Sequence, residues 1–128
     1  MKYLLDSNII IDHLHQRNEA KEWLADVRLK DTFVSYITYA EVLSGCHDEL
    51  EWEKAFFVLN EFSSIPFDLN DFMAAAKLRL IHHFKLPDAL QAALAINHQL
   101  TLITRNTKDF DPKIHKFVKI PYHLHKKS

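Results

Sequence analysis

Short runs of β-forming residues alternate with longer stretches of helical spacing, and this alternation restricts the possible folds more than any other feature of the chain. The β-rich runs cover residues 2–5, 32–35, 64–67, 101–104 and 117–120. Strands that alternate with helices build a parallel sheet, joined by right-handed crossovers and covered by helices on both faces. We therefore expect an α/β fold of three layers, with a central parallel sheet of about five short strands flanked by helices.

The helical stretches carry boundary signals of their own. Apolar residues repeat at helical spacing over residues 49–62, and Asn70 precedes another long helical pattern as a candidate N-cap. Thr38 and Glu41 have the spacing of a capping box. A helix buried beside the sheet is predicted from Pro87 onward, because the stretch is rich in alanine and leucine and proline suits a first helical position.

Size and composition predict one domain over residues 1–128. The chain is 48% apolar, which suffices for a single core. We expect a soluble, cytoplasmic protein without membrane contact, because the N-terminus lacks the apolar core of a signal peptide and no apolar stretch is long enough to span a bilayer. The single cysteine, Cys46, is expected to be a small buried side chain rather than a reactive thiol.

The chain contains a single glycine, Gly45, and this count excludes several functions. The dinucleotide-binding fingerprint, the phosphate-binding loop and the nucleophile elbow of serine hydrolases each need at least two glycines. A zinc site is disfavoured although the chain has 9 histidines, because no His-Glu-x-x-His motif is present and Cys46 has no cysteine partner.

Four acidic residues fall where α/β sheets usually place their ligands. Asp6 ends the first β-rich run, and Asp109 follows the run at 101–104. Glu41 and Asp88 stand in the first turns of two predicted helices. Converging carboxylates repel by about 1 kcal/mol per pair at a separation of about 4 Å in water, so such a cluster needs raised pKa values or a bound cation. A divalent metal ion with oxygen ligands meets this need.

Each acid also has a structural explanation. Glu41 could complete the capping box, Asp88 could complement a helix dipole, and Asp109 could cap a turn. Asp6 is harder to explain in this way, because it interrupts an apolar stretch and a bare buried carboxylate costs several kcal/mol. The four acids together are therefore stronger evidence for a site than any one of them.

Four sequence blocks occur in order along nearly the whole chain: LDSNIIID (residues 5–12), SxxTxxExxxG (35–45), PDAL (87–90) and TRNxxDF (104–110). Together they resemble the PIN domain of the VapC toxin type. The resemblance implies a PIN-like α/β fold and a metal-dependent endoribonuclease that cleaves RNA phosphodiester bonds. It further implies the toxin of a type II toxin–antitoxin system, with a homodimeric assembly and a cognate antitoxin protein as partner.

The resemblance also assigns roles to individual acids. The first three family acids map onto Asp6, Glu41 and Asp88. The fourth position is open, because many members have an aspartate where this chain has Asn106, and Asp109 could supply the carboxylate instead. The candidate catalytic residues are thus Asp6, Glu41, Asp88 and Asp109. The candidate metal ligands, direct or through water, are Asp6, Asp88, and Asp109 or Asn106, and Glu41 either binds the metal or orients the attacking water.

An all-oxygen ligand set favours Mg²⁺ or Mn²⁺ over zinc. Side chains near the acids are expected to support the metal site or contact phosphate, and these are Ser7, Asn8 and Thr104. Basic side chains are expected to hold RNA backbone phosphates, with an affinity that falls as salt rises, and these are Arg79, Arg105 and Lys108.

Charge and aromatic content point to binding surfaces. Residues 1–64 have six basic and twelve acidic side chains, net −6, whereas residues 65–128 have ten and five, net +5. The positive half flanks the proposed acidic site, which suits a phosphate-bearing substrate. Aromatic residues on the predicted helix 49–62 either pack in the core or form a partner surface, and they include Trp52, Phe56 and Phe57.

Rival functions fit the sequence less well. A HAD-like phosphatase needs a second aspartate two residues after the first, and that residue is Asn8. A receiver-type phosphoacceptor needs an acid pair near its first strand, and this chain has none there. A degenerate nuclease fold that only binds a partner stays open because of Asn106, and cleavage of single-stranded RNA would distinguish it from an enzyme.

Overall fold

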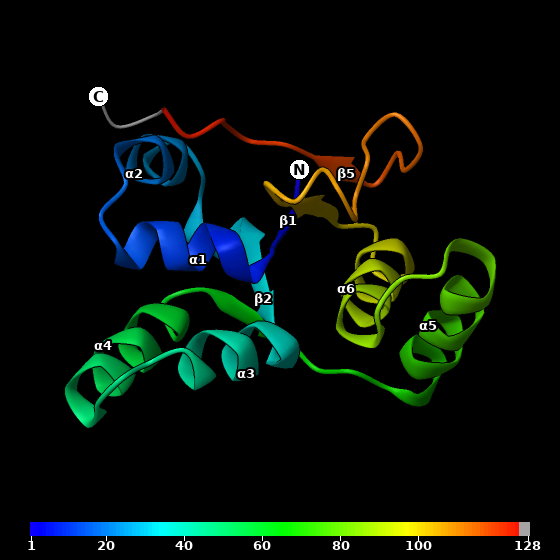
Figure 1. Ribbon diagram of the computed structural model, residues 1–128, viewed down its shortest axis with the longest axis horizontal. Coiled ribbons are helices and arrows are strands. Elements are labelled where there is room, and N and C mark those ends of the chain that lie inside the picture. Colours follow the sequence, from blue (N-terminus) through cyan, green and yellow to red (C-terminus); the bar gives the residue numbers. More distant parts are fainter. Residues whose placement is uncertain (126–128) are drawn as a thin grey trace.

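A computed structural model describes residues 1–125 and contains a five-stranded sheet with the strand order β3-β2-β1-β4-β5 (Figure 1). The strands are β1 (Tyr3–Leu5), β2 (Thr32–Ser35), β3 (Ser63–Ile65), β4 (Thr101–Ile103) and β5 (Val118–Lys119). All neighbouring strands are parallel, so the expected sheet is confirmed. β3 and β5 are shorter than the predicted runs at 64–67 and 117–120.

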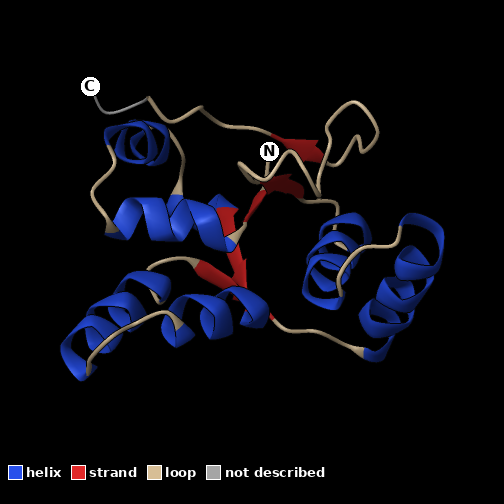
Figure 2. Ribbon diagram, viewed as in Figure 1, coloured by secondary structure: helices blue, strands red, loops and turns tan. Residues whose placement is uncertain are grey.

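Helices cover both faces of this sheet. They are α1 (Ser7–Leu14), α2 (Asn18–Ala25), α3 (Tyr36–Ser44), α4 (Glu49–Leu59), α5 (Leu69–His82) and α6 (Leu86–Asn97), with a short 3-10 helix, η1, at Leu29–Asp31. Helices α1 to α4 lie on one side of the strands, and α5 and α6 lie on the other (Figure 2). The structure therefore has the three layers that the alternation predicts.

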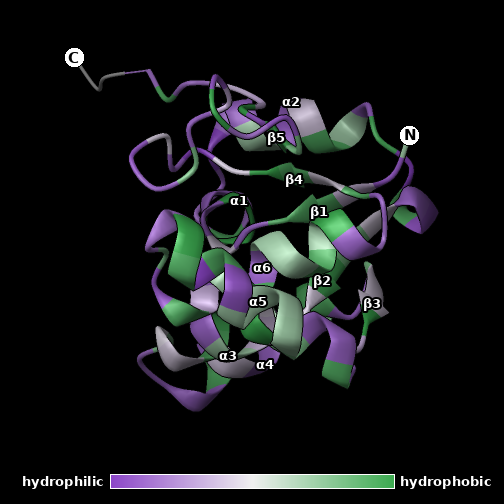
Figure 3. Cartoon of the chain, turned by 90° about the vertical axis from the view of Figure 1, so that its right-hand side faces the viewer, coloured by the Kyte–Doolittle hydropathy of each residue, from purple (hydrophilic) through white to green (hydrophobic). Residues whose placement is uncertain are grey.

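Neighbouring residues of the central strands serve two separate cores. Leu4 and Leu102 pack with α5 and α6, whereas Leu5 and Ile103 pack with α1, α3 and α4. This division follows from strand geometry, because successive side chains point to opposite faces of a sheet. Both β1 and β4 are accordingly hydrophobic along their length (Figure 3), as expected for parallel strands buried on both faces.

The order of the strands changes direction between β1 and β4. From β1 the chain proceeds to β2 and β3 on one side, and it then returns to β4 and β5 on the other side. Open α/β sheets bind ligands outside the carboxyl ends of their strands at such a switch point. Asp6 and Thr104 directly follow β1 and β4, so both residues lie at this edge.

Two helices begin at residues other than those predicted. α5 begins at Leu69 because Asp68 and Asp71 form a capping box, so the prediction of Asn70 as N-cap was wrong. α6 begins one residue earlier than expected, at Leu86, and Pro87 therefore occupies its second position. Proline is tolerated there because the first N–H groups of a helix have no partner within the helix.

The predicted capping box of Thr38 and Glu41 was also wrong. The N-cap of α3 is Ser35, whose hydroxyl accepts from the N–H of Thr38 at 3.3 Å. Thr38 lies inside the helix and is fully buried. The Glu41 carboxylate is therefore free of the cap and available for other contacts. The helix predicted over 49–62 ends three residues earlier, at Leu59.

The structure also bears on two further features, membrane-spanning helices and the burial of Cys46. No helix within residues 1–125 combines the length and the apolar character needed to cross a membrane. Cys46 was expected to be buried, but it is only partly buried, and its thiol lies 3.6 Å from the carbonyl oxygen of Val42.

Candidate active site

Asp6 lies where β1 passes directly into α1. Its N–H donates to the carbonyl of Ile103 at 2.9 Å, which extends the pairing of β1 and β4 by one residue. Its side chain caps α1, because one carboxylate oxygen accepts from the N–H of Ser7 at 2.9 Å. Asp6 is only 6% exposed, so its ionised carboxylate depends on the donors around it.

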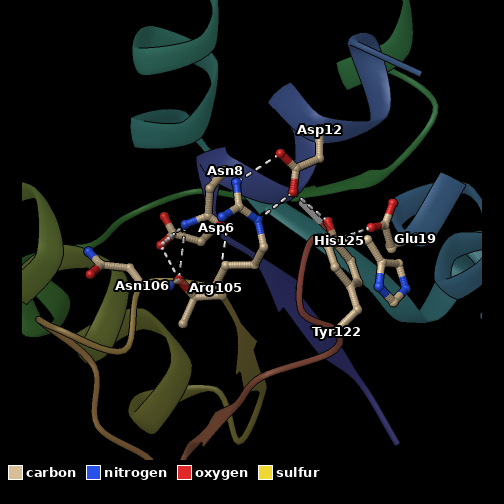
Figure 4. Close-up of polar contacts among 9 residues, drawn as sticks. Asp6, Asn8, Asp12, Glu19, Arg105, Asn106, Tyr122 and His125 are labelled. Carbon is tan, nitrogen blue, oxygen red and sulfur yellow. Dashed lines mark hydrogen bonds and ion pairs between the residues drawn. The ribbon is translucent and has the colours of Figure 1, made fainter. Parts of the chain in front are cut away.

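Three further donors face the Asp6 carboxylate from different elements. The Thr104 hydroxyl donates at 2.8 Å, the Asn8 amide at 3.3 Å and the Gln91 amide at 3.5 Å. Asn8 also donates to the Thr104 oxygen at 3.1 Å, so the residues after β1 and β4 are joined directly (Figure 4). Two of the predicted supporting residues, Asn8 and Thr104, therefore touch Asp6 through their side chains.

Glu41 reaches the same edge from α3. Its carboxylate accepts from the Ser7 hydroxyl at 2.5 Å, a length typical of a strong hydrogen bond to a charged oxygen. Ser7 is buried and adjoins Asp6 in the chain, whereas Glu41 is exposed. Ser7 thus orients Glu41 beside Asp6 while the rest of the Glu41 side chain stays open to solvent.

Asp88 completes the acidic group from the first turn of α6. Its pKa is raised to about 6, first by burial and then by the negative charges of Asp6, Asp109 and Glu41. Lys85 acts in the opposite direction. The structure thus places Asp88 within electrostatic reach of the other three predicted acids.

Asn106 and Asp109 form a tight turn after β4. The Asn106 amide donates to the Asp109 carboxylate at 2.8 Å, and its amide oxygen accepts from the N–H of Asp109 at 3.2 Å. The N–H of Asn106 in turn donates to the Thr104 hydroxyl at 3.0 Å. Asn106 therefore caps the turn, a role that the sequence suggested for Asp109, and its amide holds the Asp109 carboxylate in place.

Arg105 was expected to contact phosphate, but its guanidinium is engaged inside the protein. It donates to the buried carboxylate of Asp12 from Nε at 2.5 Å and from Nη2 at 2.8 Å (Figure 4). Asp12 also accepts from the Tyr122 hydroxyl at 2.8 Å. Burial and this hydrogen bond raise the pKa of Tyr122. Arg105 is thus a structural side chain that joins the loop after β4 to α1 and to the C-terminal segment.

The other predicted cations have different positions. Arg79 Nε donates to the carbonyl oxygen of Phe84 at 3.0 Å and so fastens the connection between α5 and α6. Lys108 is exposed next to Asp109 in the loop after β4. Lys85, just before α6, is close enough to Asp88 to lower its pKa. Lys85 and Lys108 are therefore better placed for a phosphate beside the acids than Arg79 or Arg105.

Two residues around the site were missed in the sequence, Gln91 and Asp12. Both are almost fully buried, and each interrupts an apolar stretch, in α6 and α1 respectively. A polar residue in a buried apolar run needs a buried partner, and this signal indicated Asp6 in the sequence. The same signal is present at Gln91 and Asp12. The identity of the partners could not be found in this way, because they lie far away in the chain.

The donor set fits a hard divalent cation. The groups that meet at the edge are carboxylate, amide and hydroxyl oxygens, which suit Mg²⁺ or Mn²⁺ better than zinc. Within the described residues, no three acidic, histidine or cysteine side chains lie close enough together to hold a metal ion by themselves. Mg²⁺ usually keeps several waters and needs only one or two direct carboxylates.

Comparison with known proteins gave both a family and related structures. The family model of the PIN domain matches residues 3–112. A chain of a toxin–antitoxin complex from Klebsiella pneumoniae is 35% identical, with a TM-score of 0.86, and the match covers 96% of this chain and 100% of that one. No match was found among curated proteins.

Two further structures share the fold. FitAcB from Neisseria gonorrhoeae is 27% identical with a TM-score of 0.76, and the match covers 95% of this chain and 99% of that chain. DNA-bound VapBC from Salmonella typhimurium is 19% identical with a TM-score of 0.73, covering 87% of this chain and 91% of that chain. At the latter identity the likeness concerns the fold alone.

Proposed function

The chain belongs to the PIN domain family, and from this premise we propose that it is a metal-dependent endoribonuclease and the toxin of a type II toxin–antitoxin pair. The observation that carries the proposal is the meeting of acids at the carboxyl edge of the sheet. Asp6 directly follows β1, and the hydroxyl of the adjoining Ser7 donates to the Glu41 carboxylate at 2.5 Å. Burial, and after it the charges of three neighbouring acids, raise the pKa of Asp88 to about 6. A carboxylate with a raised pKa at the ligand-binding edge of an α/β sheet is typical of a functional site. The likeness to a chain of a toxin–antitoxin complex supports the biological role.

Asp6, Asp88 and Asp109 are the residues that would hold Mg²⁺ or Mn²⁺, directly or through water. A bound ion would lower the pKa of the attacking water and neutralise charge on the departing oxygen. Glu41 is held toward this position by the Ser7 hydroxyl at 2.5 Å, so it can orient the water and accept its proton. Thr104 and Asn8 keep the Asp6 carboxylate in a fixed orientation through hydrogen bonds of 2.8 and 3.3 Å.

The substrate in this proposal is RNA, and the side chains that would hold its phosphates are Lys85 and Lys108. Both stand beside the acidic cluster, Lys85 next to Asp88 and Lys108 next to Asp109. Contacts of this kind do not depend on base sequence, and they weaken as salt displaces them. RNA binding should therefore weaken as ionic strength rises, while the acids define where the backbone is cut.

Two exposed apolar faces suit two different protein partners. A hollow of about 320 Å³ between α1, α3 and α4 is lined mainly by apolar side chains, including Ile11, Leu14, Val42 and Ala55. It lies beside the α4 aromatics named above, of which Phe57 is 70% exposed. A groove next to exposed aromatics fits an apolar helix of a smaller protein, so we assign it to the cognate antitoxin.

The second apolar face lies on α5, which packs mainly against α6. Its exposed members lie on the outer part of the helix and are Leu69, Phe72, Met73, Leu80 and Ile81. The hollow between α1, α3 and α4 does not include these residues. An apolar helix surface of this kind suits packing against its own copy about a two-fold axis, so we assign it to a homodimer.

Cleavage of single-stranded RNA by the purified full-length protein tests the enzyme. We expect cleavage with Mg²⁺ or Mn²⁺, none with a chelator, and loss of cleavage in Asp6→Asn, which keeps a residue able to cap α1. Glu53→Gln, an exposed change on α4, is the control and should cleave normally. If the well-folded wild-type protein binds RNA without cutting it, the protein is a binding module and not a nuclease.

Expression in bacteria tests the toxin role separately. The wild-type chain should slow growth, and Asp6→Asn at equal protein level should relieve this effect, because the cleavage site has lost a metal-binding carboxylate. Equal toxicity of the two proteins would remove nuclease activity as the cause.

A further inference from the structure

We propose that Gln91 is a positioning residue that sets the relative placement of Asp6, Glu41 and Asp88. The inference rests on the proposed function, since it assigns Gln91 a role in that same site. Gln91 lies on α6 and is 1% exposed, in a stretch from Ala89 to Ala95 whose other members are buried alanines and leucines. A polar amide in such surroundings needs partners for its donors and its acceptor.

The Gln91 amide has partners on two other elements. Its oxygen accepts from the Ser35 hydroxyl at 2.6 Å, and its nitrogen donates to the Thr38 hydroxyl oxygen at 2.9 Å. The same nitrogen lies 3.5 Å from a carboxylate oxygen of Asp6, so one of its two hydrogens can point to each acceptor. The Thr38 hydroxyl then donates to the carbonyl of Leu5 at 3.3 Å.

The orientation of the amide follows from these partners. The Ser35 hydroxyl has one hydrogen, and it also serves as the acceptor for the N–H of Thr38 at 3.3 Å. Because a carboxylate can only accept, the NH₂ group faces Asp6 and Thr38, and the Gln91 oxygen therefore faces Ser35. A carboxylate in place of the amide would turn an acceptor toward Asp6 and would lose both donors.

Three residues of this hydrogen-bonded chain, Thr38, Gln91 and Leu5, each stand one turn or one residue away from an acid of the site. Thr38 precedes Glu41 by three residues in α3, and Gln91 follows Asp88 by three residues in α6. Residues spaced by three lie on the same side of a helix. Leu5 is joined directly to Asp6. The Gln91 amide thus links the three elements that bear Asp6, Glu41 and Asp88, within one turn of each acid. A shift of one element would move its acid relative to the other two.

A buried polar group on α5 that is bonded to α6 provides a comparison. The Asp71 carboxylate, 1% exposed, accepts from the Asn97 amide at 2.9 Å and so joins the start of α5 to the end of α6. This link binds the same helix, but it contacts none of the four acids. Replacing Asn97 should therefore weaken the fold without changing the acidic site.

The experiment compares the wild-type chain, Gln91→Met and Asn97→Ala for binding of Mn²⁺ by calorimetry, for RNA cleavage and for thermal unfolding. Methionine has a similar length and volume but no donors. Loss of residues that hold a metal ligand typically lowers metal affinity or activity by about 10- to 100-fold, and we expect a loss of this size in Mn²⁺ affinity and kcat for Gln91→Met. KM for RNA should change by less than about threefold, because the phosphate contacts are untouched. Asn97→Ala should unfold at lower temperature with unchanged Mn²⁺ affinity and kcat.

The same measurements separate this inference from the proposed function. Wild-type protein that binds Mn²⁺ but cuts no RNA would overturn the nuclease, while weaker Mn²⁺ binding by Gln91→Met would still support the positioning role. Equal Mn²⁺ affinity in wild type and Gln91→Met would overturn the positioning role, even if both cut RNA. If Gln91→Met does not fold, Thr38→Val keeps the side-chain shape, removes the central link and is judged by the same criterion.

Discussion

The acids of the site differ in what surrounds each carboxylate. Asp6 is buried among four donors, whereas Asp88 is partly buried beside three negative charges. The first environment satisfies an ionised group, and the second disfavours it. A cation at this edge would stabilise both, because it supplies the charge that the four acids lack. Mutation of Asp6 and mutation of Asp88 should therefore have different effects.

Asp88→Asn should stabilise the metal-free fold at neutral pH. Because folding raises the pKa of Asp88 from 3.8 to about 6, the ionised form is disfavoured in the folded state. Stability from this group is therefore highest at low pH and is lost as the pH rises from about 4 to about 6. With allowance for solvent screening, the variant should gain about 1–2 kcal/mol at pH 7.5 and nothing at pH 4. Urea unfolding in metal-free buffer measures this gain.

The control for that measurement is Glu53→Gln, which removes an exposed acid on α4. It should show no gain at either pH. The Asp88→Asn protein should also lose RNA cleavage, so that stability and activity change in opposite directions. A variant that is no more stable than wild type at pH 7.5 would contradict the electrostatic strain at Asp88.

Asp109→Asn should lower cleavage by orders of magnitude and leave the fold intact. Asp109 supplies a carboxylate in the turn after β4, whereas the Asn106 oxygen is already engaged as the acceptor for the N–H of Asp109 at 3.2 Å. A metal ligand neutralises charge in the transition state, an effect of about several kcal/mol. If the Asn106 amide oxygen binds the metal instead, Asn106→Asp should bind Mg²⁺ more tightly through its added charge. Mg²⁺-dependent cleavage rates of both variants decide the question, and near-wild-type activity of Asp109→Asn would assign the position to Asn106.

Hydrogen bonds and an ion pair between different elements hold the side chains of the site in their relative positions. The loop after β4 is tied to α1 twice, by the Arg105–Asp12 ion pair and by the N–H of Arg105, which donates to the Asn8 side chain at 3.0 Å. The C-terminal segment runs back from β5 across α1 toward α2 (Figure 1), and Tyr122 joins the same ion pair. Asp12 is therefore a common acceptor for a loop and a terminal segment that lie far apart in the chain.

Tyr122→Phe should destabilise the fold by about 1–2 kcal/mol, the usual effect of losing a hydrogen bond to a charged group. The ring still fills its space, so the change reports the hydroxyl that donates to Asp12 at 2.8 Å. Tyr36→Phe is the matched control, because Tyr36 is 54% exposed. Urea unfolding of the three proteins measures the difference. Equal stability of Tyr122→Phe and wild type would mean that the C-terminal segment is held by other contacts.

The apolar faces and the charge distribution concern the molecule as an assembly. The acidic edge, the hollow beside α4 and the outer face of α5 involve different sets of residues. A chain arranged in this way could bind RNA, an antitoxin and a second copy of itself at separate places. The sequence pointed to the aromatic residues of α4 as a candidate partner surface, and the structure adds the α5 face as a second candidate.

Leu80→Glu should convert a dimer to a monomer. Leu80 is 79% exposed on the outer face of α5, and a buried charge at a two-fold interface would occur twice. Light scattering should give twice the chain mass of 15.1 kDa for the wild type and the single mass for the variant. Ile114→Glu, at a 66% exposed apolar residue outside α5, should remain dimeric. A dimer that survives Leu80→Glu but dissociates in Phe57→Glu would place the interface at α4.

The order of strands and helices and the identity of the acids follow from local features of the sequence. Hydrophobic spacing distinguishes strand from helix within a few residues. A carboxylate can be recognised as a candidate metal ligand from its residue type alone. Because parallel strands share one carboxyl edge, the positions of Asp6 and Asp109 after their runs were enough to predict a common site. Four ordered sequence blocks pointed to the same family as the comparisons later did.

Contacts between distant residues were decided only by the tertiary structure. Asp12 and Arg105 are separated by 93 positions, and Gln91 and Asp6 by 85, so no local pattern could pair them. The N-caps of α3 and α5 are Ser35 and Asp68. Their identity depended likewise on which of several candidate side chains reached the free N–H groups of the helix. Periodicity and residue type describe what a segment needs, whereas the partner that meets the need depends on the folded arrangement of all the elements.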